Sequence, residues 1–247
     1  MKRLIATTAL LGSLATGSFA QNLAPMTDEE RALFRAEVRA YLLENPEVIM
    51  QAVEVLQNRE AQNQAQADFD LVSQNADALF DDGYSFVGGN PDGDIVLVEF
   101  LDYRCGYCKR AHGEVAELLE TDGNIKWIVK ELPILGDASV LASRFAVAVK
   151  QVSGGESYQA VGNALMSFNG DITLPALRRL GNTFGLDMPA IEARMDSEEV
   201  TAEIVATRAL ADALQISGTP TFVMQDELLR GYLPLDQMQA IVEDKRS

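Results

Sequence analysis

Apolar positions at helical spacing mark the front of the chain. Residues 27–30 (TDEE) have the composition of a helix capping box, and Phe34 and Val38 then fall on one helical face. Pro46 suits a first helical turn, and a second apolar stripe runs through residues 48–56. These stripes are too small to build a core of their own. The two helices are therefore predicted to pack on the main domain or on copies of themselves.

A polar stretch separates these helices from the rest of the chain. Residues 57–66 (QNREAQNQAQ) contain no large apolar side chain, a composition that fits either a solvated helix or a linker. Helical periodicity resumes at Phe69 and leads into a second, larger unit.

The larger unit combines strand and helix patterns. Residues 95–101 (IVLVEFL) are almost continuously apolar, as in a central strand buried on both faces. The other predicted elements are an edge strand at 84–87, a strand at 125–129, a mainly helical block at 137–214, a closing hairpin at 221–224 and 228–232, and a last helix at 236–243. This order predicts an α/β fold whose sheet carries a helical insertion after its third strand.

The first twenty residues have the pattern of a secretory signal. Lys2 and Arg3 precede an apolar run at 4–14, and Ser18-Phe19-Ala20 forms a small-x-small cleavage site. The alternative is a membrane anchor, but the clean apolar run is shorter than the roughly 20 residues that span a bilayer. The sequence therefore predicts an exported protein in an oxidising compartment, the periplasm.

The charge of the chain narrows the classes of partner. The formal net charge is −17, and removal of two positive charges with the signal takes it to −19 (−17 − 2). A strongly acidic surface argues against nucleic acid and anionic membranes as partners.

The two cysteines, Cys105 and Cys108, carry the candidate chemistry. A disulfide that closes so small a loop stabilises a fold weakly, so the pair is predicted to be redox-active rather than structural. At a helix start, the first N–H groups and the helix dipole favour a thiolate at Cys105, and Cys108 lies one turn later. Cys105 is thus the predicted nucleophile, and Cys108 the thiol that resolves the mixed disulfide.

A metal site is the alternative for the same cluster. Cys105, Cys108 and His112 have the spacing C-x2-C-x3-H, but His112 is the only histidine and no second pair of ligands completes a tetrahedral site. The prediction is no resident metal and no cofactor beyond the Cys105–Cys108 disulfide, with transient copper capture as a further hypothesis. His112 is predicted to be a surface residue.

Two more positions point to the same site. Glu99 interrupts an apolar strand six residues before Cys105, and buried beneath the dithiol it would have a raised pKa and shuttle a proton to Cys108. The alternative is an edge position facing water, and Lys130 is a candidate partner. Thr219 and Pro220 precede the closing hairpin, where an exposed Thr219 backbone would pair with an extended substrate.

These segments resemble a known family. DIVLVEFLDYRCGYCKR, KELPILG and SGTPTFVM followed by LLRGYLPLDQ resemble the DsbA-like branch of the thioredoxin superfamily, from about residue 84 to the C-terminus. YLLENPEVIMQAVEVL is similar to the N-terminal segment of the suppressor-of-copper-sensitivity (ScsC) proteins. The resemblance implies a thioredoxin fold with an inserted helical domain.

The resemblance also implies roles. Cys105 would attack, Cys108 would resolve, Glu99 would be the buried acid and Thr219 would precede a cis-proline, Pro220. Gly106-Tyr107 departs from the Pro-His pair of the dedicated oxidase and is similar to the Gly-Tyr pair of periplasmic disulfide isomerases. We therefore expect a centre less oxidising than the oxidase.

The partners implied are protein substrates with disulfides, a membrane-bound thiol reductase of the same pathway, and further copies of the chain, with a trimer favoured. The predicted organisation is a signal at 1–20, an oligomerisation segment and linker at 21–66, and a catalytic domain at 67–247. Three functional hypotheses follow: a disulfide isomerase or reductase, a dithiol oxidase, and a copper-binding protein that uses the dithiol.

Overall fold

The computed structural model describes residues 26–247, so the predicted signal at residues 1–20 lies outside the described residues. The chain divides into two compact units, one ending at Asn58 and the other running from Arg59 to Ser247. This division falls inside a helix, eight residues before the end of the segment predicted as a linker at 66.

The first unit holds α1 (Asp28–Glu44) and the first part of α2 (Glu47–Gln74). The predicted capping box is confirmed: the Thr27 backbone N–H donates to a Glu30 carboxylate oxygen at 2.8 Å, and the Glu30 N–H donates to Thr27 Oγ1 at 3.3 Å. No residue of α1 is buried. Its apolar stripe therefore lacks a covering partner within the described part of the chain.

The polar stretch at 57–66 is helical and belongs to α2. The Gln64 and Gln66 side chains each donate to a carboxylate four residues later, at 2.9 and 3.0 Å, which supports a solvated helix that lacks an apolar face. Of the two alternatives that the composition allowed, the helix is observed. The last turns of α2 belong to the second unit and bury Val72.

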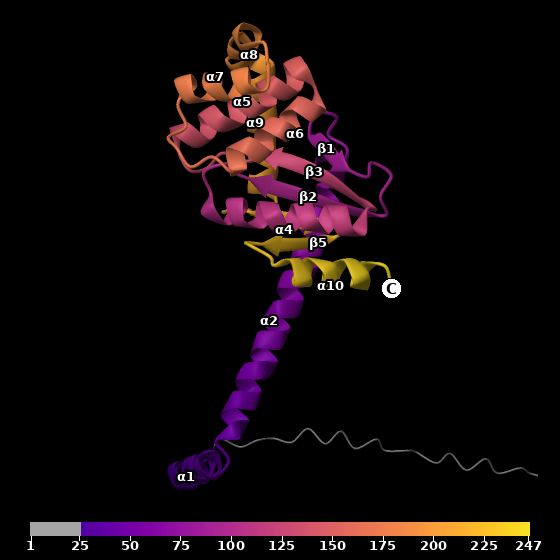
Figure 1. Ribbon diagram of the computed structural model, residues 1–247. Coiled ribbons are helices and arrows are strands. Elements are labelled where there is room, and N and C mark those ends of the chain that lie inside the picture. Colours follow the sequence, from indigo (N-terminus) through magenta and orange to yellow (C-terminus); the bar gives the residue numbers. More distant parts are fainter. Residues whose placement is uncertain (1–25) are drawn as a thin grey trace, which may run out of the picture. The chain divides into compact units, whose positions relative to one another are not determined.

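A five-stranded sheet forms the centre of the second unit (Figure 1). Its strands are β1 (Phe86–Gly89), β2 (Ile95–Leu101), β3 (Ile125–Glu131), β4 (Thr221–Met224) and β5 (Glu227–Arg230), in the order β1-β3-β2-β4-β5. β2 and β3 are parallel, and the other neighbours are antiparallel. β1 begins two residues later than predicted because the Asp82 carboxylate accepts the N–H groups of Tyr84 and Ser85, which holds them in a turn.

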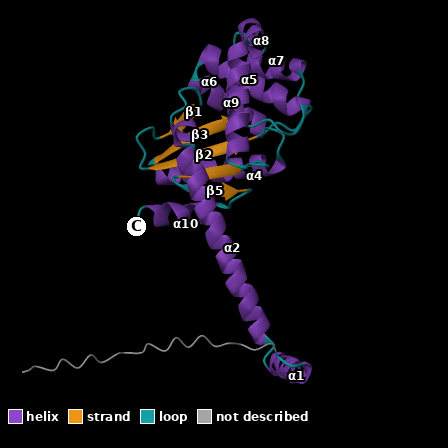
Figure 2. Cartoon of the chain, turned by 180° about the vertical axis from the view of Figure 1, so that it is seen from behind, coloured by secondary structure: helices purple, strands orange, loops and turns teal. Residues whose placement is uncertain are grey.

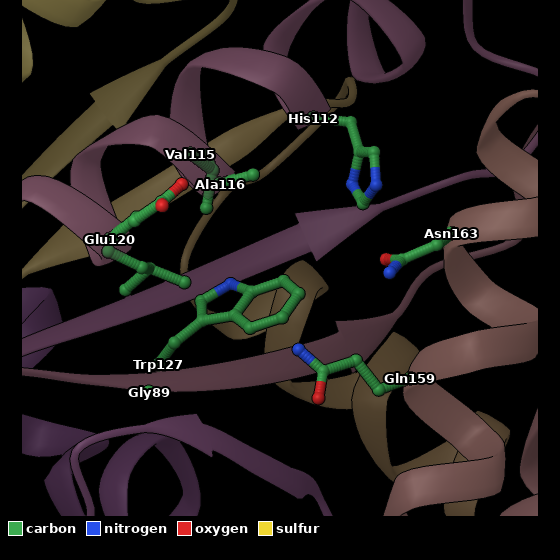
Figure 3. A pocket seen from close by; sticks show the side chains of 9 residues that line it. Gly89, His112, Val115, Ala116, Glu120, Trp127, Gln159 and Asn163 are labelled. Atoms are coloured by element: carbon green, nitrogen blue, oxygen red, sulfur yellow. The ribbon is translucent and has the colours of Figure 1, made fainter.

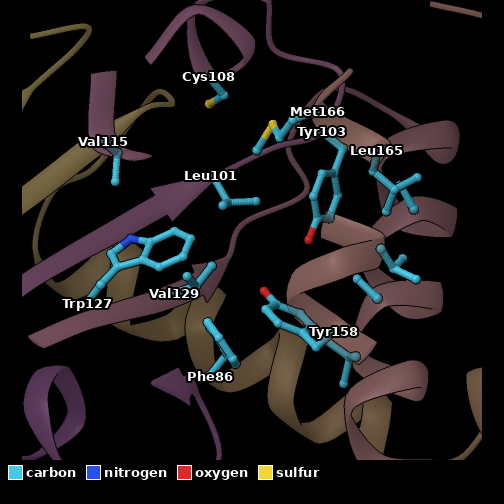
Figure 4. Close-up of a cluster of buried hydrophobic side chains, with 14 of the residues drawn as sticks. Phe86, Leu101, Tyr103, Cys108, Val115, Trp127, Val129, Tyr158, Leu165 and Met166 are labelled. Carbon is cyan, nitrogen blue, oxygen red and sulfur yellow. The ribbon is translucent and has the colours of Figure 1, made fainter. Parts of the chain in front are cut away.

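Alternation along β2 sends its side chains to two cores. Ile95, Leu97 and Leu101 face α4 (Gly106–Asp122) and α10 (Leu235–Lys245), while Val98 and Phe100 face the opposite layer. Figure 4 shows the first core, where Cys108 and Val115 of α4 lie among the apolar side chains of the sheet. Glu99 has the parity of Leu97 and Leu101, so the pleat directs it toward the α4 side.

The second core is closed by helices from distant parts of the chain. The end of α2, α3 (Ala76–Phe80) and the end of α9 (Glu198–Ala213) contribute Val72, Leu79 and Leu210 to it. Both faces of β2 are therefore covered, as its continuous apolar composition predicted.

The helical insertion lies between β3 and β4. It consists of α5 (Asp137–Ser153), α6 (Gly155–Met166), α7 (Leu174–Thr183), α8 (Met188–Met195) and α9. In Figures 1 and 2 the first four of these helices gather to one side of the sheet, while the end of α9 packs on the second core. The predicted fold class, a thioredoxin-type sheet with a helical insertion after its third strand, is confirmed.

Candidate active site

The dithiol lies where β2 ends and α4 begins. Cys105 is the N-cap of α4 with an extended backbone (φ −73°, ψ 118°), and its N–H donates to the Asp102 carbonyl at 3.0 Å. Cys108, in the first turn of α4, lies 3.7 Å from Cys105. Both thiols are free. The separation allows one thiol to reach the sulfur of the other with little change in the backbone.

The two thiols differ in exposure and in chemistry. Cys105 is 8% exposed, whereas Cys108 is 0% exposed, so only Cys105 is open to a partner. Burial raises the pKa of the Cys108 thiol well above its ordinary value, and the neighbouring Cys105 and Glu99 raise it further. Cys108 therefore needs a base before it can act as a nucleophile.

Glu99 lies on the same side of the sheet as Cys108 and is near enough for its charge to act on that thiol. It is fully buried, and burial, assisted by the charge of Glu131, raises its pKa to about 7. The Trp127 indole N–H donates to Glu99 Oε2 at 3.0 Å, while Oε1 has no hydrogen-bond partner within the described chain. A carboxyl group with one free oxygen and a pKa near neutrality is suited to exchange a proton with a nearby thiol.

Lys130, the candidate partner of Glu99, does not pair with it. In the parallel register of β2 and β3, Lys130 is opposite Phe100, so its side chain leaves the other face of the sheet. There its ammonium group donates to the Asp82 carboxylate at 2.5 Å and to the Ala78 carbonyl at 2.7 Å. The register thus separates the two charged residues.

The loop before β4 completes the site. The Thr219–Pro220 peptide bond is cis, and the Cys105 thiol donates to the Thr219 carbonyl oxygen at 3.0 Å. Two residues 114 positions apart in the chain are thereby brought into contact.

The dipeptide between the cysteines faces outward. Gly106 has open space where a side chain would begin, and Tyr107 is 63% exposed. The Tyr107 ring lies 6.4 Å from that of Tyr232, and the Arg110 guanidinium lies 4.4 Å from the Tyr232 ring centroid. Neither residue of the dipeptide provides a positive charge beside the thiols.

A second buried acid was not found by sequence reasoning. Glu131, at the end of β3, accepts hydrogen bonds from the hydroxyls of Tyr103, Tyr158 and Ser143 at 2.6–2.7 Å. Figure 4 shows the Tyr103 and Tyr158 hydroxyls turned toward one region of the core. Burial raises the pKa of Glu131 to about 7, against the effect of these hydrogen bonds. The sequence did contain a signal for Glu131: it is an acidic residue at the end of an apolar strand, just as Glu99 is an acidic residue within one.

Asp102 was also missed. Its buried carboxylate accepts from the N–H groups of Arg104, Ile134 and Leu135 and from the Ser139 hydroxyl, at 2.8–3.1 Å. It therefore ties the turn that carries Cys105 to the loop between β3 and α5. Arg104 is near Asp102 in the chain, but the other three partners are more than 30 positions away, so local sequence gives no sign of them.

His112, predicted to be a surface residue, lies in α4 and is only partly exposed. It is partly buried at a cavity of about 320 Å³ that is also lined by Trp127, Gln159 and Asn163 (Figure 3). Burial lowers the pKa of His112, against a hydrogen bond with Asn163. Because α6 packs beside α4, a position predicted to face water is half covered. No group of three or more His, Cys, Asp or Glu side chains in residues 26–247 has the arrangement of a metal site.

The sheet order, the dithiol at the start of α4 and the adjacent cis-proline loop define a thioredoxin-class dithiol protein. The thioredoxin family model matches residues 81–244, and a model described as the copper resistance protein ScsC N-terminal domain matches residues 30–63. The chain belongs to the thioredoxin family of thiol–disulfide oxidoreductases and, within it, to the DsbA-like proteins of the ScsC type.

Solved structures agree with this assignment. A thioredoxin-like oxidoreductase from Silicibacter pomeroyi is 40% identical, with 70% of this chain and 98% of that chain covered and a TM-score of 0.66. BcfH of Salmonella enterica Typhimurium is 26% identical, with 89% and 97% covered and a TM-score of 0.72. Proteus mirabilis ScsC in a transitional conformation is 26% identical, with 89% and 98% covered and a TM-score of 0.65.

Curated relatives match over a part of their length. The Na+/H+ antiporter NhaA 3 of Salinispora tropica is 24% identical over 156 residues, which are 63% of this chain. The chain spans 24% of the length of that relative, so the match concerns only a portion of a much longer protein.

Proposed function

We propose that this chain catalyses thiol–disulfide exchange on protein substrates and works mainly as a disulfide isomerase or reductase. The observation that carries the proposal is the pairing of a reachable Cys105, beside the Thr219 carbonyl at 3.0 Å, with a fully buried Cys108 above Glu99. In such a pair Cys105 attacks the substrate disulfide, and Cys108 later resolves the mixed disulfide that forms.

The reaction proceeds in two exchanges. The Cys105 thiolate attacks one sulfur of a partner disulfide, an S–S bond forms between them, and the other partner sulfur leaves as a thiolate and takes a proton. Cys108 then gives its proton to Glu99, attacks the Cys105 sulfur and releases the second partner thiol. The two electrons that reduce the partner come from the dithiol, which becomes the Cys105–Cys108 disulfide. An isomerase cycle ends earlier, when a substrate thiol displaces Cys105.

The direction toward isomerisation rests on the dipeptide and on the loop. Gly106-Tyr107 and Thr219 are similar to the corresponding residues of periplasmic isomerases, and neither residue of the dipeptide is a histidine that would stabilise the Cys105 thiolate. A less stabilised thiolate makes the disulfide form less oxidising. A less oxidising centre is a better electron donor, which suits reduction and reshuffling of substrate disulfides, and a partner reductase must then keep its dithiol reduced.

The dithiol oxidase is the second candidate, because the same chemistry runs in either direction. Recovery of activity from a substrate with scrambled disulfides supports the isomerase, and activity restricted to fully reduced substrate supports the oxidase. The redox state of the dithiol in its native compartment separates them independently: mostly reduced in an isomerase or reductase, mostly oxidised in an oxidase.

Copper binding is the third candidate, favoured by the copper-resistance description of the N-terminal family model. The soft ligands on offer are the thiols of Cys105 and Cys108. Tight Cu(I) binding by protein that shows no exchange with a model disulfide would favour this function over the first two.

We further propose that the protein is periplasmic, that a membrane-bound thiol reductase keeps it reduced, and that it assembles through the first unit, as a trimer. The signal pattern at residues 1–20 supports export. None of the helices between residues 26 and 247 is long and apolar enough to cross a bilayer.

The uncovered apolar side chains of α1 support assembly.

Paired cysteine variants test the mechanism. Cys105→Ser should abolish exchange with a model disulfide, because the only thiol open to a partner is removed. Cys108→Ser should still attack and should accumulate a mixed disulfide, visible as added mass on the intact protein. Surviving exchange in the Cys105 variant, or absence of trapped product in the Cys108 variant, would contradict the assigned roles.

A further inference from the structure

A cavity beside the nucleophile combines two cations and is not used by the exchange chemistry. It measures about 290 Å³ and lies between the start of α4 and the loop between α6 and α7. Its lining comprises Tyr103, Arg104, Lys109, Ala138 and residues 168–172. Arg104 directly precedes Cys105 in the chain and Lys109 follows Cys108, so both cations belong to the segment that carries the dithiol.

The two cations are held in place by main-chain carbonyls. Arg104 Nη1 donates to the Leu135 carbonyl at 3.2 Å, and the Lys109 ammonium donates to the Phe168 carbonyl. Neither side chain has a carboxylate within ion-pair distance in the part of the chain that the structure describes. A guanidinium has five N–H donors and an ammonium three, so both groups retain donors for a ligand.

The charge of this cavity contrasts with that of the protein. The chain has 37 acidic and 20 basic residues, and many of the basic residues in the second unit are already paired with carboxylates. One carboxylate, Asp171, lines the cavity and offsets part of its positive charge. A local positive field within an acidic surface attracts an anionic group to this point and repels it elsewhere.

We propose that this cavity binds a carboxylate side chain of the substrate, and that the protein therefore reacts preferentially with disulfides whose cysteine has an aspartate or glutamate close by in sequence. This inference rests on the proposed exchange function and adds substrate selection to it. An extended peptide rises about 3.3 Å per residue, so a carboxylate one to three residues from the reacting cysteine lies about 3–10 Å along the peptide from it, the range in which we expect the site to act.

Matched peptides test the preference. Each peptide has blocked ends, one cysteine in a disulfide with the uncharged thiol 2-mercaptoethanol, and a glutamate at one of the three positions on either side, with a glutamine twin. At low ionic strength we expect at least one glutamate peptide to react about 3–10 times faster than its twin with the reduced protein. The ratio should approach one as salt shortens the Debye length to about 3 Å at 1 M.

Variants of the full chain assign the preference to the cavity. The rate ratio of the twins cancels any change in the reactivity of Cys105 itself. Arg104→Gln combined with Lys109→Gln should lower the ratio to one or below, and Asp171→Asn should raise it about twofold. Lys126→Gln combined with Arg179→Gln removes the same number of charges away from the cavity and should leave the ratio within a factor of two.

The outcomes separate the two proposals. Glutamine peptides that react while no glutamate peptide reacts faster would overturn the carboxylate site and leave the exchange function standing. A preference that survives in the Arg104 and Lys109 variant, or falls equally in the Lys126 and Arg179 control, would also overturn it. If no peptide of either kind reacts, the exchange function is wrong and the inference fails with it.

Discussion

At the scale of residues, the site depends on carboxyl groups that the fold keeps away from water. Glu99 and Glu131 are both fully buried on the α4 side of the sheet, and burial raises the pKa of each to about 7. Glu131 is surrounded by three hydroxyl donors, whereas Glu99 has one donor, Trp127, and one free oxygen. The less satisfied acid lies beside Cys108. Its weak solvation destabilises its charged form and so raises its affinity for the proton that the resolving thiol must give up.

Glu99 should make stability depend on pH. Its pKa is about 7 in the folded protein and 4.5 ordinarily, so between these values the folded state binds more protons than the unfolded state. The free energy of unfolding therefore falls as pH rises through this window. Above about pH 7 the folded protein bears the full cost of burying the Glu99 carboxylate. Glu99→Gln, which retains an acceptor for Trp127, should gain roughly 1–3 kcal/mol at pH 8 and little at pH 4.

Urea unfolding of the reduced protein at both pH values measures this gain. Glu117→Gln, on the exposed side of α4, is the matched control and should be within about 0.5 kcal/mol of wild type at both. An equal effect of Glu99→Gln at pH 4 and pH 8 would show that Glu99 ionises normally in the fold.

At the scale of elements, one carboxylate joins two segments that the sheet order brings to the same edge. β2 and β3 are parallel, so the turn after β2 and the loop after β3 leave the sheet side by side. Asp102 accepts two donors from the β3–α5 loop, Ile134 N and Leu135 N, and a third from Ser139 in α5. The position of Cys105 is thereby fixed relative to the helical insertion.

Removal of the Asp102 carboxylate should loosen this connection. Asp102→Ala leaves buried N–H groups without acceptors and should cost about 2–4 kcal/mol of unfolding free energy. Its exchange rate should also fall, because the Cys105 turn is held less firmly. Asp92→Ala, in an exposed turn, is the control and should change stability by less than about 0.5 kcal/mol. Denaturant unfolding measures the stability of both variants. An unchanged free energy of unfolding in Asp102→Ala would show that the loop is held by other contacts.

At the scale of the whole molecule, the two units differ in how their apolar side chains are covered. The second unit buries two continuous cores on either face of its sheet. In the first unit, Phe34, Val38, Leu43 and Ile49 line an open hollow of about 400 Å³ and remain largely exposed. An uncovered apolar surface of this kind usually marks an interaction site. The match of residues 30–63 to the ScsC N-terminal domain falls on the same segment.

Assembly through this hollow is testable by light scattering on the mature chain. We expect a mass that is a multiple of the single chain, and a single-chain mass after deletion of residues 21–58. The deletion stops at 58 because the following part of α2 belongs to the second unit, where Asp68 forms a bidentate ion pair with Arg230 at 2.6 and 2.8 Å.

A point variant gives the same test without a deletion. Phe34→Glu places a charge in the hollow and should dissociate the assembly, while Glu37→Gln, on the same helix but outside the hollow, should not. A monomeric wild-type chain, or an assembly unaffected by both the deletion and Phe34→Glu, would contradict assembly through the first unit.

The sequence alone determined the elements and the reactive pair. A nearly continuous apolar run places the central strand at Ile95–Leu101, and helical periodicity places the insertion, because a strand buried on both faces needs apolar side chains throughout and a helix repeats every 3.6 residues. The capping box at Thr27 is likewise a local interaction. The spacing of Cys105 and Cys108 sets a dithiol at a helix start, since one turn of a helix separates residues three apart.

Only the tertiary structure decided what surrounds that pair. The strand register sends Glu99 toward Cys108 and Lys130 to the opposite face, an outcome that periodicity within either strand does not determine. Long-range contacts bring Thr219 to Cys105 across 114 positions, and the packing of α6 half covers His112. The burial that raises the pKa of Glu99 comes from the helices that close the core, so the local sequence specified the thiol chemistry and the fold specified its environment.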